Sequence, residues 1–340
     1  MRVAGAAFAA LLSLTSTAAA QEDLSLRVLD FAELDGWSDD RHDEALDVFT
    51  RSCDLIDGPE WPGLCELASR NPQARTFFEL FFRPVLIEDG RDPLFTGYFE
   101  PEIDGARTRT HRFRVPVYSL PSGGTSLTRS EISQGALAGR GLEIAWVDDP
   151  TELFFLQVQG SGRIRLTNGQ TIRIGYAGHN GHPYRSLGEA LIARGTYEPH
   201  QVSADVIKNW VRRNPVEGQA LLDHSPSYVF FRELPNLAMS LGPIGAMNRS
   251  ITPMRSIAVD PSFVPLGAPV WIEKAGADPI HRLMIAQDTG SAIKGAQRAD
   301  VFYGTGDKAG KQAGRIRDPG RVIVLLPIQI AYALQERAAG

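Results

Sequence analysis

The spacing of hydrophobic positions divides the chain into a helical first part and a β-rich remainder. Residues 43–55 carry apolar side chains at helical spacing, and Asn71-Pro72 is a helix-start signal that precedes an aromatic run ending at Phe82. From residue 94 the period changes to two, which is the spacing of a half-buried strand. We therefore expect N-terminal helices followed by a mainly β structure with several helices.

Short runs of strand character recur along the rest of the chain and are separated by turn residues. These runs are 94–101, 113–118, 153–158, 163–166, 171–176, 255–259, 269–273, 282–287 and 321–326. Asn168-Gly169 lies between two of them and predicts a tight hairpin.

Two helices are predicted inside the middle of the chain. Ser186 and Glu189 have the spacing of a capping box, and the helix that they begin should end at Gly195. A second helix is expected from Ser203 to about Arg213. The block 105–240 then contains its own strands and helices, so we expect it to be a β-rich domain inserted into a domain formed by 21–104 plus 241–340.

The first twenty residues have the pattern of a secretory signal peptide. Arg2 is followed by an apolar run from Val3 to Leu14, and Ala18-Ala19-Ala20 supplies small residues before Gln21. We expect cleavage after Ala20 and a soluble periplasmic protein. No cysteine lies near the cleavage site, which argues against a lipid anchor there.

Composition and charge narrow the class of protein. Hydrophobic residues make up 43% of the chain and charged residues 22%, as in a packed globular protein, and 33 Gly and 22 Pro favour a turn-rich β fold. The net charge of −5 makes general nucleic-acid binding unlikely on electrostatic grounds. The two cysteines, Cys53 and Cys65, are expected to form a local disulfide in an oxidising compartment, with two buried thiols as the alternative.

Three aspartates follow or precede apolar strands near the end of the chain. Asp260 follows 256–259, Asp288 follows 283–286, and Asp300 precedes Val301-Phe302. A carboxyl at such an edge is partly desolvated, which raises its pKa and suits it to general-acid work. The ordinary alternative is that each aspartate caps a turn.

His179 and His182 are three residues apart, but the intervening Asn180-Gly181 and the following Pro183 indicate a loop rather than a helical metal face. We expect no metal and no cofactor. Loop rigidity or hydrogen bonding to a sugar is the preferred interpretation of these histidines.

Four separated segments resemble the MltA family of lytic murein transglycosylases, in the same order as in the family. They are Phe95-Thr96-Gly97-Tyr98-Phe99-Glu100-Pro101, Val158-Gln159-Gly160-Ser161-Gly162, the segment 175–186, and Asp288…Ala292-Ile293-Lys294-Gly295…Asp300. The resemblance implies a double-psi β-barrel with a second β-rich domain inserted and a substrate groove between the two. It also implies cleavage of the MurNAc–GlcNAc β-1,4 bond of peptidoglycan without water, which leaves 1,6-anhydro-MurNAc ends.

The resemblance also implies roles for particular residues. Asp300 corresponds to the family's catalytic acid and base, and Asp288 and Asp260 correspond to its other two aspartates. Substrate contacts are expected from Tyr98, Glu100, Gln159, Ser161, Tyr176, His179, Tyr184 and Lys294. Tyr98, Tyr176, Tyr184 and Trp271 are candidates for stacking on sugars or for the core. The partners are glycan strands of peptidoglycan, and the protein is expected to be a monomer.

Two other functions remain open from the residues alone. An inverting β-glucan hydrolase would use two carboxylates about 6.5–9.5 Å apart with a water between them. A non-catalytic protein would bind the glycan and leave it intact.

Overall fold

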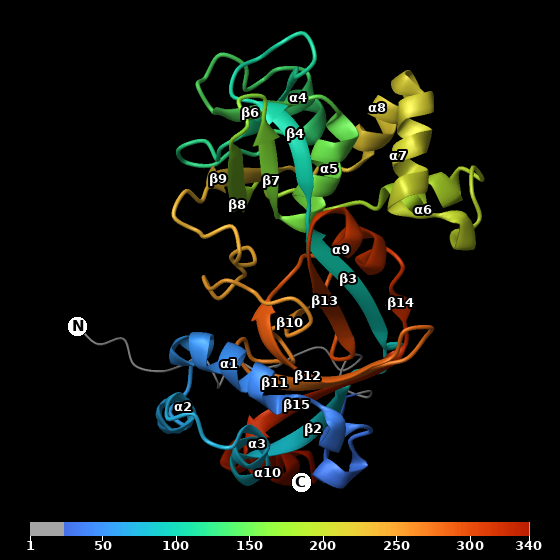
Figure 1. The fold of residues 1–340 in the computed structure, drawn as a ribbon. Coiled ribbons are helices and arrows are strands. Elements are labelled where there is room, and N and C mark those ends of the chain that lie inside the picture. The colour runs from blue at the N-terminus through green and yellow to red at the C-terminus, as the bar shows by residue number, and fades with distance from the viewer. Residues whose placement is uncertain (1–23, 340) are drawn as a thin grey trace. The chain divides into compact units, whose positions relative to one another are not determined.

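The computed structural model describes residues 24–339, so the predicted signal peptide and its cleavage site lie outside the described residues. The chain divides into two units (Figure 1). The first contains the described residues up to Gly97, then Ile244–Tyr303, and the described residues from Ile316 onward. The second contains Tyr98–Pro243 and Gly304–Arg315.

The first unit is built on a nine-stranded sheet with the order β1-β2-β15-β11-β12-β10-β13-β3-β14. Its strands are β1 (Ser25–Val28), β2 (Phe82–Glu88), β3 (Leu94–Glu100), β10 (Ser256–Val259), β11 (Pro269–Lys274), β12 (Ile280–Asp288), β13 (Arg298–Thr305), β14 (Arg317–Asp318) and β15 (Gly320–Pro327). β3 and β13 each extend a few residues into the second unit. The helices are α1 (His42–Ser52), α2 (Trp61–Ser69), α3 (Ala74–Phe81) and α10 (Ile328–Ala339).

One hydrophobic core holds the helices of the first unit to its sheet. The aromatic run of the sequence analysis supplies Phe77, Phe78 and Phe82, which pack with Phe49 of α1. β10, β11 and β15 are almost wholly buried, which explains why their sequences are continuous apolar runs rather than alternating ones.

The second unit contains a six-stranded sheet with the order β5-β6-β4-β7-β8-β9. Its strands are β4 (Glu102–Ala106), β5 (Val115–Tyr118), β6 (Glu143–Val147), β7 (Ser161–Leu166), β8 (Thr171–His179) and β9 (Val229–Glu233). Its helices are α4 (Arg129–Ser133), α5 (Pro150–Gln159), α6 (Leu187–Ala193), α7 (Ala204–Arg213), α8 (Pro215–His224) and α9 (Gly306–Ala313). The predicted hairpin is confirmed, because β7 and β8 pair antiparallel across Asn168-Gly169. The helix that follows Ser186 is confirmed as well.

The prediction of a strand over 153–158 is wrong, because these residues lie in helix α5. Asp149 caps the helix by accepting a hydrogen bond from the Thr151 N–H at 2.7 Å, and Pro150 occupies its first turn. Gly160 ends it in the left-handed conformation at φ 77°. The helix packs Leu156 toward the sheet and Phe154 toward α6–α8, so it is apolar on more than one side and shows little helical periodicity.

The pairing in the first unit runs as an open series from β1 to β14, and no pairing among residues 24–339 joins those edges into a closed barrel. The double-psi β-barrel is therefore not confirmed. Ten α-helices and fifteen strands occur in the described part of the chain, so the class is mixed α and β rather than mainly β.

The predicted disulfide between Cys53 and Cys65 is confirmed. Cys53 follows α1 and Cys65 lies in α2, so the bond closes a short loop and fastens two neighbouring helices of the first unit.

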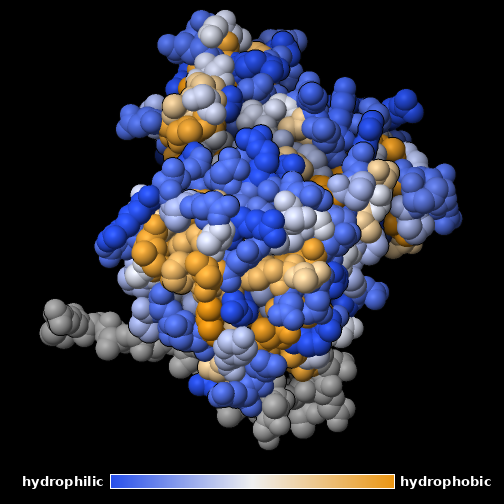
Figure 2. Space-filling view, turned by 60° about the horizontal axis from the view of Figure 1, so that its bottom comes forward, coloured by the Kyte–Doolittle hydropathy of each residue, from blue (hydrophilic) through white to orange (hydrophobic). Residues whose placement is uncertain are grey.

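Hydrophobic side chains reach the surface in several separate areas of an otherwise largely hydrophilic face (Figure 2). No helix within residues 24–339 is long and apolar enough to cross a membrane.

Candidate active site

The sheet of the first unit gathers the three aspartates at one end of three neighbouring strands. β10 lies between β12 and β13; it runs parallel to β12 and antiparallel to β13. Asp288 ends β12 and Asp260 follows the last residue of β10, while Asp300 lies near the start of β13. Parallel neighbours finish at the same edge where an antiparallel neighbour begins, so residues up to 40 positions apart converge there.

The register fixes how Asp288 and Asp300 are arranged. Both are aligned with Ala258, from opposite sides of β10. The pairing of β10 with β12 shifts register between Ile257 and Ala258, so a β-bulge interrupts the regular alternation of side chains just before Asp288. The backbones of Asp288 and Asp300 are two strand spacings apart, or about 10 Å.

Asp300 is partly buried and its ionisation is strongly perturbed. The Thr96 hydroxyl on β3 donates a hydrogen bond to Asp300 Oδ1 at 2.7 Å. Burial raises the pKa of Asp300 to about 6, against the smaller opposing effects of the Thr96 hydrogen bond and the Arg298 charge. A carboxyl with that pKa can both hold and release a proton near neutral pH.

Asp260 has the opposite electrostatic character. Burial acts to raise its pKa, but hydrogen bonds from the Gly295 and Ser262 N–H groups and the charge of Lys294 lower the pKa below its ordinary value overall. Asp260 is only 5% exposed, and each of its oxygens accepts one of these N–H groups. The geometry suits it to hold the loop around Gly295, where φ is +116°, and not to transfer protons.

Asp288 also binds backbone groups. Its Oδ1 accepts hydrogen bonds from the Ala246 N–H at 3.0 Å and the Thr289 N–H at 2.9 Å. Asp288 therefore holds the turn around Ala246 against the end of β12.

Lys294 is the one predicted substrate-binding residue of the first unit. Its side chain is 58% exposed, and its Nζ lies 3.9 Å from Asp260 Oδ1. Trp271 is fully buried in the core and donates to Glu273, so the core interpretation of Trp271 is correct.

The remaining predicted substrate-binding residues belong to the second unit. Tyr176 and Tyr184 are 49% and 39% exposed, and His179 is exposed with its Nδ1 accepting the Gly181 N–H. Tyr98 is half-buried, and Gln159 accepts a hydrogen bond from the Phe99 N–H at 2.9 Å. Ser161 is buried at the start of β7, where it pairs with Gly175.

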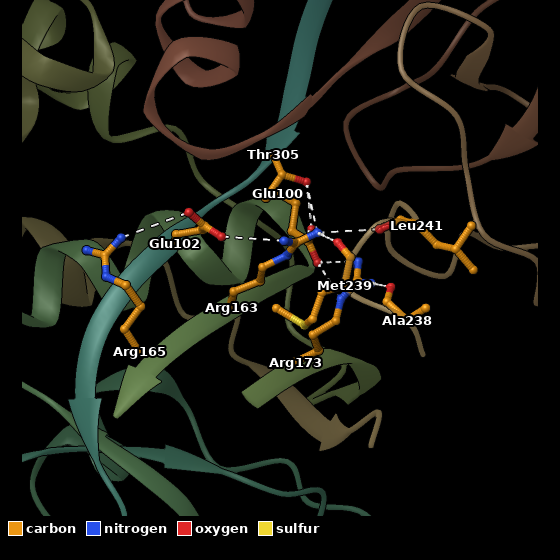
Figure 3. Close-up of polar contacts among 9 residues, drawn as sticks. All are labelled: Glu100, Glu102, Arg163, Arg165, Arg173, Ala238, Met239, Leu241 and Thr305. Atoms are coloured by element: carbon orange, nitrogen blue, oxygen red, sulfur yellow. Dashed lines mark hydrogen bonds and ion pairs between the residues drawn. The ribbon is translucent and has the colours of Figure 1, made fainter. Parts of the chain in front are cut away.

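Glu100 does not fit the expectation of a substrate contact, because its side chain is inaccessible. Its Oε1 accepts from Arg173, and its Oε2 accepts from Arg163 Nε at 2.9 Å and from the Thr305 hydroxyl at 2.8 Å (Figure 3). The same two arginines donate to the carbonyl groups of Ala238 and Met239. Glu100 thus joins the end of β3 to β7, β8, the end of β13 and the segment after β9.

A metal centre finds no support among residues 24–339, where no group of three or more His, Cys, Asp and Glu side chains could hold an ion. His182 Nε2 instead lies 2.7 Å from the Ser126 carbonyl oxygen. An apolar hollow of about 180 Å³ in the first unit is lined by residues such as Phe263, Ile330 and Leu334. It contains none of the predicted site residues.

Comparisons with known proteins agree with this architecture. The MltA-specific insert domain matches residues 94–128 and 124–232, and the 3D domain matches residues 255–326. Membrane-bound lytic murein transglycosylase A of Vibrio cholerae is 37% identical over 257 residues, which span 71% of this chain and 68% of that protein. The protein of the same name from Escherichia coli K12 is 36% identical over 243 residues, 68% of this chain and 65% of its own length.

Solved structures extend the similarity to nearly the whole fold. A membrane-bound lytic murein transglycosylase from Agrobacterium tumefaciens has a TM-score of 0.80 and 32% identity, covering 92% of this chain and 99% of that one. Escherichia coli MltA with bound chitohexaose has a TM-score of 0.71 and 30% identity, covering 86% of this chain and 90% of its own. The fold and the aspartate-bearing sheet therefore define a protein that combines a 3D domain with an MltA-specific insert. The chain belongs to the MltA family of lytic murein transglycosylases.

Two residues beside Asp300 were not singled out by the sequence analysis. Thr96 lies within the quoted segment 95–101 and Arg298 lies two residues before Asp300. Thr96 contacts both Arg298 and Asp300, and these contacts depend on the adjacency of β3 and β13, strands that lie about 200 residues apart in the chain.

Proposed function

We propose that this protein cleaves the MurNAc–GlcNAc β-1,4 bond of peptidoglycan without water and leaves 1,6-anhydro-MurNAc ends. The observation that carries the proposal is Asp300, a partly buried carboxyl with a pKa of about 6 in the 3D domain of an MltA family member. Asp300 is the proposed catalytic residue.

In the first half of the reaction, protonated Asp300 donates its proton to the glycosidic oxygen as the bond to C1 breaks. Positive charge then develops on the MurNAc ring, and the GlcNAc leaves as an alcohol. Asp300 becomes a carboxylate close to the sugar, and its negative charge stabilises the positive charge of the MurNAc ring.

In the second half, the same carboxylate removes the proton from the C6 hydroxyl of MurNAc as O6 attacks C1. The new C1–O6 bond closes the anhydro ring, and Asp300 regains the proton that it gave away. Because the nucleophile belongs to the same sugar, neither a second carboxylate nor a bound water is required.

The engagement of the other two aspartates favours this reaction over the inverting hydrolase. Asp260 is held ionised by two backbone N–H groups, and Asp288 uses Oδ1 to bind two more. These backbone N–H groups engage both carboxylates in holding loops, and the mechanism with one residue needs no second carboxylate to activate water. We assign Asp288 and Asp260 to positioning the loops around Asp300.

The proposed substrate contacts are the accessible side chains Tyr98, Gln159, Tyr176, His179, Tyr184 and Lys294. Tyrosine rings suit the apolar faces of sugars, and the polar side chains suit their hydroxyl and amide groups. We also propose export to the periplasm with cleavage after Ala20, and action as a monomer. Mass spectrometry of the exported protein should give a chain that begins at Gln21 without lipid; an intact Met1 would contradict export.

Product mass on purified murein glycan strands tests the function. The wild-type protein should release fragments with the mass of anhydro ends, 18 mass units below those of hydrolysis, since one water is absent. Asp300→Asn should lower the rate by about 10⁴-fold or more, because one residue serves both proton transfers. The matched control is Asp47→Asn on the exposed face of α1.

Each alternative has its own outcome in this experiment. Products that gain water indicate the hydrolase, and intact glycan that is retained by the protein indicates a binding module. Full release of anhydro products by Asp300→Asn would remove Asp300 from the mechanism.

A further inference from the structure

A chain of hydrogen bonds runs from Arg298 through Thr96 to Asp300. Arg298 Nη2 donates to Thr96 Oγ1 at 2.8 Å, and Thr96 Oγ1 donates to Asp300 Oδ1 at 2.7 Å. Arg298 and Asp300 are two residues apart on β13, so their side chains lie on the same face of the strand. Thr96 comes from the neighbouring strand β3 and lies between them.

The chemistry of these three groups fixes which one donates and which one accepts in each hydrogen bond. A guanidinium only donates hydrogen bonds, so the Thr96 oxygen is the acceptor in the first link. The single proton of the hydroxyl remains for the second link, and Asp300 Oδ1 is its acceptor. Oδ1 is therefore occupied as an acceptor, and the proton of the acid form belongs on Oδ2.

The Thr96 hydroxyl also separates the positive charge of Arg298 from the carboxyl group of Asp300. Arg298 Nη1 is held by the carbonyl oxygens of Leu94 at 3.1 Å and Ala299 at 2.7 Å. A direct pair between a guanidinium and an aspartate commonly depresses the carboxyl pKa by 1–3 units, which would leave no acid near neutral pH. With Thr96 between them, Arg298 orients the hydroxyl while Asp300 keeps its raised pKa.

We propose that Arg298 is a positioning residue that acts through the Thr96 hydroxyl, so that Oδ1 of Asp300 is fixed as an acceptor and Oδ2 transfers the proton. This inference rests on the proposed function, because it concerns how Asp300 gives and regains its proton. It names Arg298 as a positioning residue and Oδ2 of Asp300 as the oxygen that transfers the proton.

Other charged or titratable groups lie on the strands around Asp300. Tyr303 lies on the same strand, and its pKa is raised to about 12 by burial and nearby carboxylates, so it stays neutral. Arg317 of β14 is aligned with Thr96. Asp288 is aligned with the same β10 residue as Asp300. None of these three groups changes when Arg298 or Thr96 is replaced, so the variants below isolate the chain of hydrogen bonds.

The test measures kcat, KM and the pH dependence of anhydro-product release from murein glycan strands. Arg298→Met and Thr96→Val each remove one link at similar volume, and each should lower kcat by 10–100-fold with little change in KM. Thr96→Ser should restore most of the activity, because it keeps the hydroxyl. The matched control is Arg140→Met, at an exposed arginine of the second unit.

Two readouts separate positioning from a merely structural role. In Arg298→Met, loss of the positive charge should move the fall of kcat/KM at high pH upward, because Asp300 then holds its proton more tightly. The double variant Thr96→Val with Arg298→Met should be no slower than the slower single variant, since both break one chain. Arg298→Gln, which keeps an NH2 donor group without the charge, gives the same pH test if Arg298→Met does not fold.

An unshifted pH profile in the Arg298 variants, or losses that multiply in the double variant, would overturn the inference while the wild-type product stays the same. Wild-type protein that forms no anhydro product would overturn the proposed function, and with it this inference.

Discussion

At the scale of single residues, the fold shifts the pKa values of two carboxyl groups at one edge of the sheet in opposite directions. Asp260 accepts two backbone N–H groups, which keep its pKa low. Asp300 is partly buried and accepts a hydrogen bond from the Thr96 hydroxyl, and the effect of burial dominates, so its pKa rises to about 6. The two residues have the same side chain, and their environments suit Asp260 to holding a loop and Asp300 to the proton exchange that we propose for it.

The raised pKa of Asp300 has a consequence for stability. Between the ordinary value of 3.8 and about 6, the folded protein holds a proton on Asp300 that the unfolded chain has released. Stability therefore falls as pH rises through this window. Asp300→Asn should unfold like the wild type near pH 4 and be more stable at pH 7.5 by on the order of 2 kcal/mol, allowing for the partial exposure of Asp300.

Urea unfolding of both proteins at pH 4 and pH 7.5 measures this difference, with Asp47→Asn as the control. An advantage of the same size at both pH values would contradict the raised pKa.

The positions of the three aspartates could be predicted from the sequence, but their differences could not. Each is flanked by an apolar strand, and that local pattern is visible in the chain. The groups that distinguish them come from elsewhere: Gly295 binds Asp260 and Thr96 binds Asp300. Glu100 looked accessible in its motif, but Arg163 and Arg173 arrive from β7 and β8 and enclose it.

At the scale of elements, α5 shows how helix ends carry information that periodicity lacks. Its apolar residues face two hydrophobic clusters, so no polar stripe appears along it. Asp149-Pro150 at its start and Gly160 at its end are the usual helix boundaries, and they were the signal for the helix. The buried strands β10, β11 and β15 also lack alternation, but they are short apolar runs between turn residues, which is a strand signal of its own.

Asp149→Ala tests the importance of that boundary. The change removes the cap on the Thr151 N–H and the ion pair of Asp149 with Arg212 at 2.8 Å. Thermal or urea unfolding should show a loss of about 1–2 kcal/mol. Asp149→Asn, which retains a capping oxygen, should recover much of this loss; equal losses for both variants would place the effect in the ion pair.

The disulfide between the end of α1 and α2 should stabilise the first unit. It closes a loop with a sequence separation of 12, and the chain-entropy relation gives about 3 kcal/mol for a loop of that length. Replacing both Cys53 and Cys65 by alanine should lower the free energy of unfolding by about that amount. The native protein should also gain the mass of two hydrogen atoms on reduction, and free thiols in oxidised material would contradict the bond.

At the scale of the whole molecule, the Glu100 cluster lies where the chain changes unit. The chain passes between units after Gly97, Pro243 and Tyr303, and the cluster contains Glu100, the carbonyl groups of Ala238 and Met239, and Thr305. One buried carboxylate and its two arginines therefore hold together, within the second unit, residues that lie close in sequence to three of the four points where the chain changes unit.

Glu100→Gln should be far more damaging than its small change in shape suggests. It leaves Arg163 and Arg173 without their buried counter-charge, and breaking such a pair costs about 3–5 kcal/mol. Glu102→Gln is the matched control, because its carboxylate pairs with Arg163 and Arg165 at 31% exposure and should cost under about 1 kcal/mol.

Urea unfolding gives the two free energies, and limited proteolysis should cut the Glu100→Gln protein faster near residues 238–241. Similar free energies of unfolding for the two variants would show that the Glu100 cluster does not stabilise the fold more than an exposed ion pair does.

The pairing of β2 with β15 determines the order in which this protein can be assembled. Val85 is aligned with Val324, so the strand that joins β2 to β11 is missing until almost the whole chain is available. The second unit has its six-stranded sheet between residues 102 and 233 and can form that sheet earlier. Closing a contact over so many residues is slow, and an already folded insert shortens the effective loop. Thr96 meets Asp300 only after β13 has been made, so a partly synthesised chain lacks the assembled candidate site.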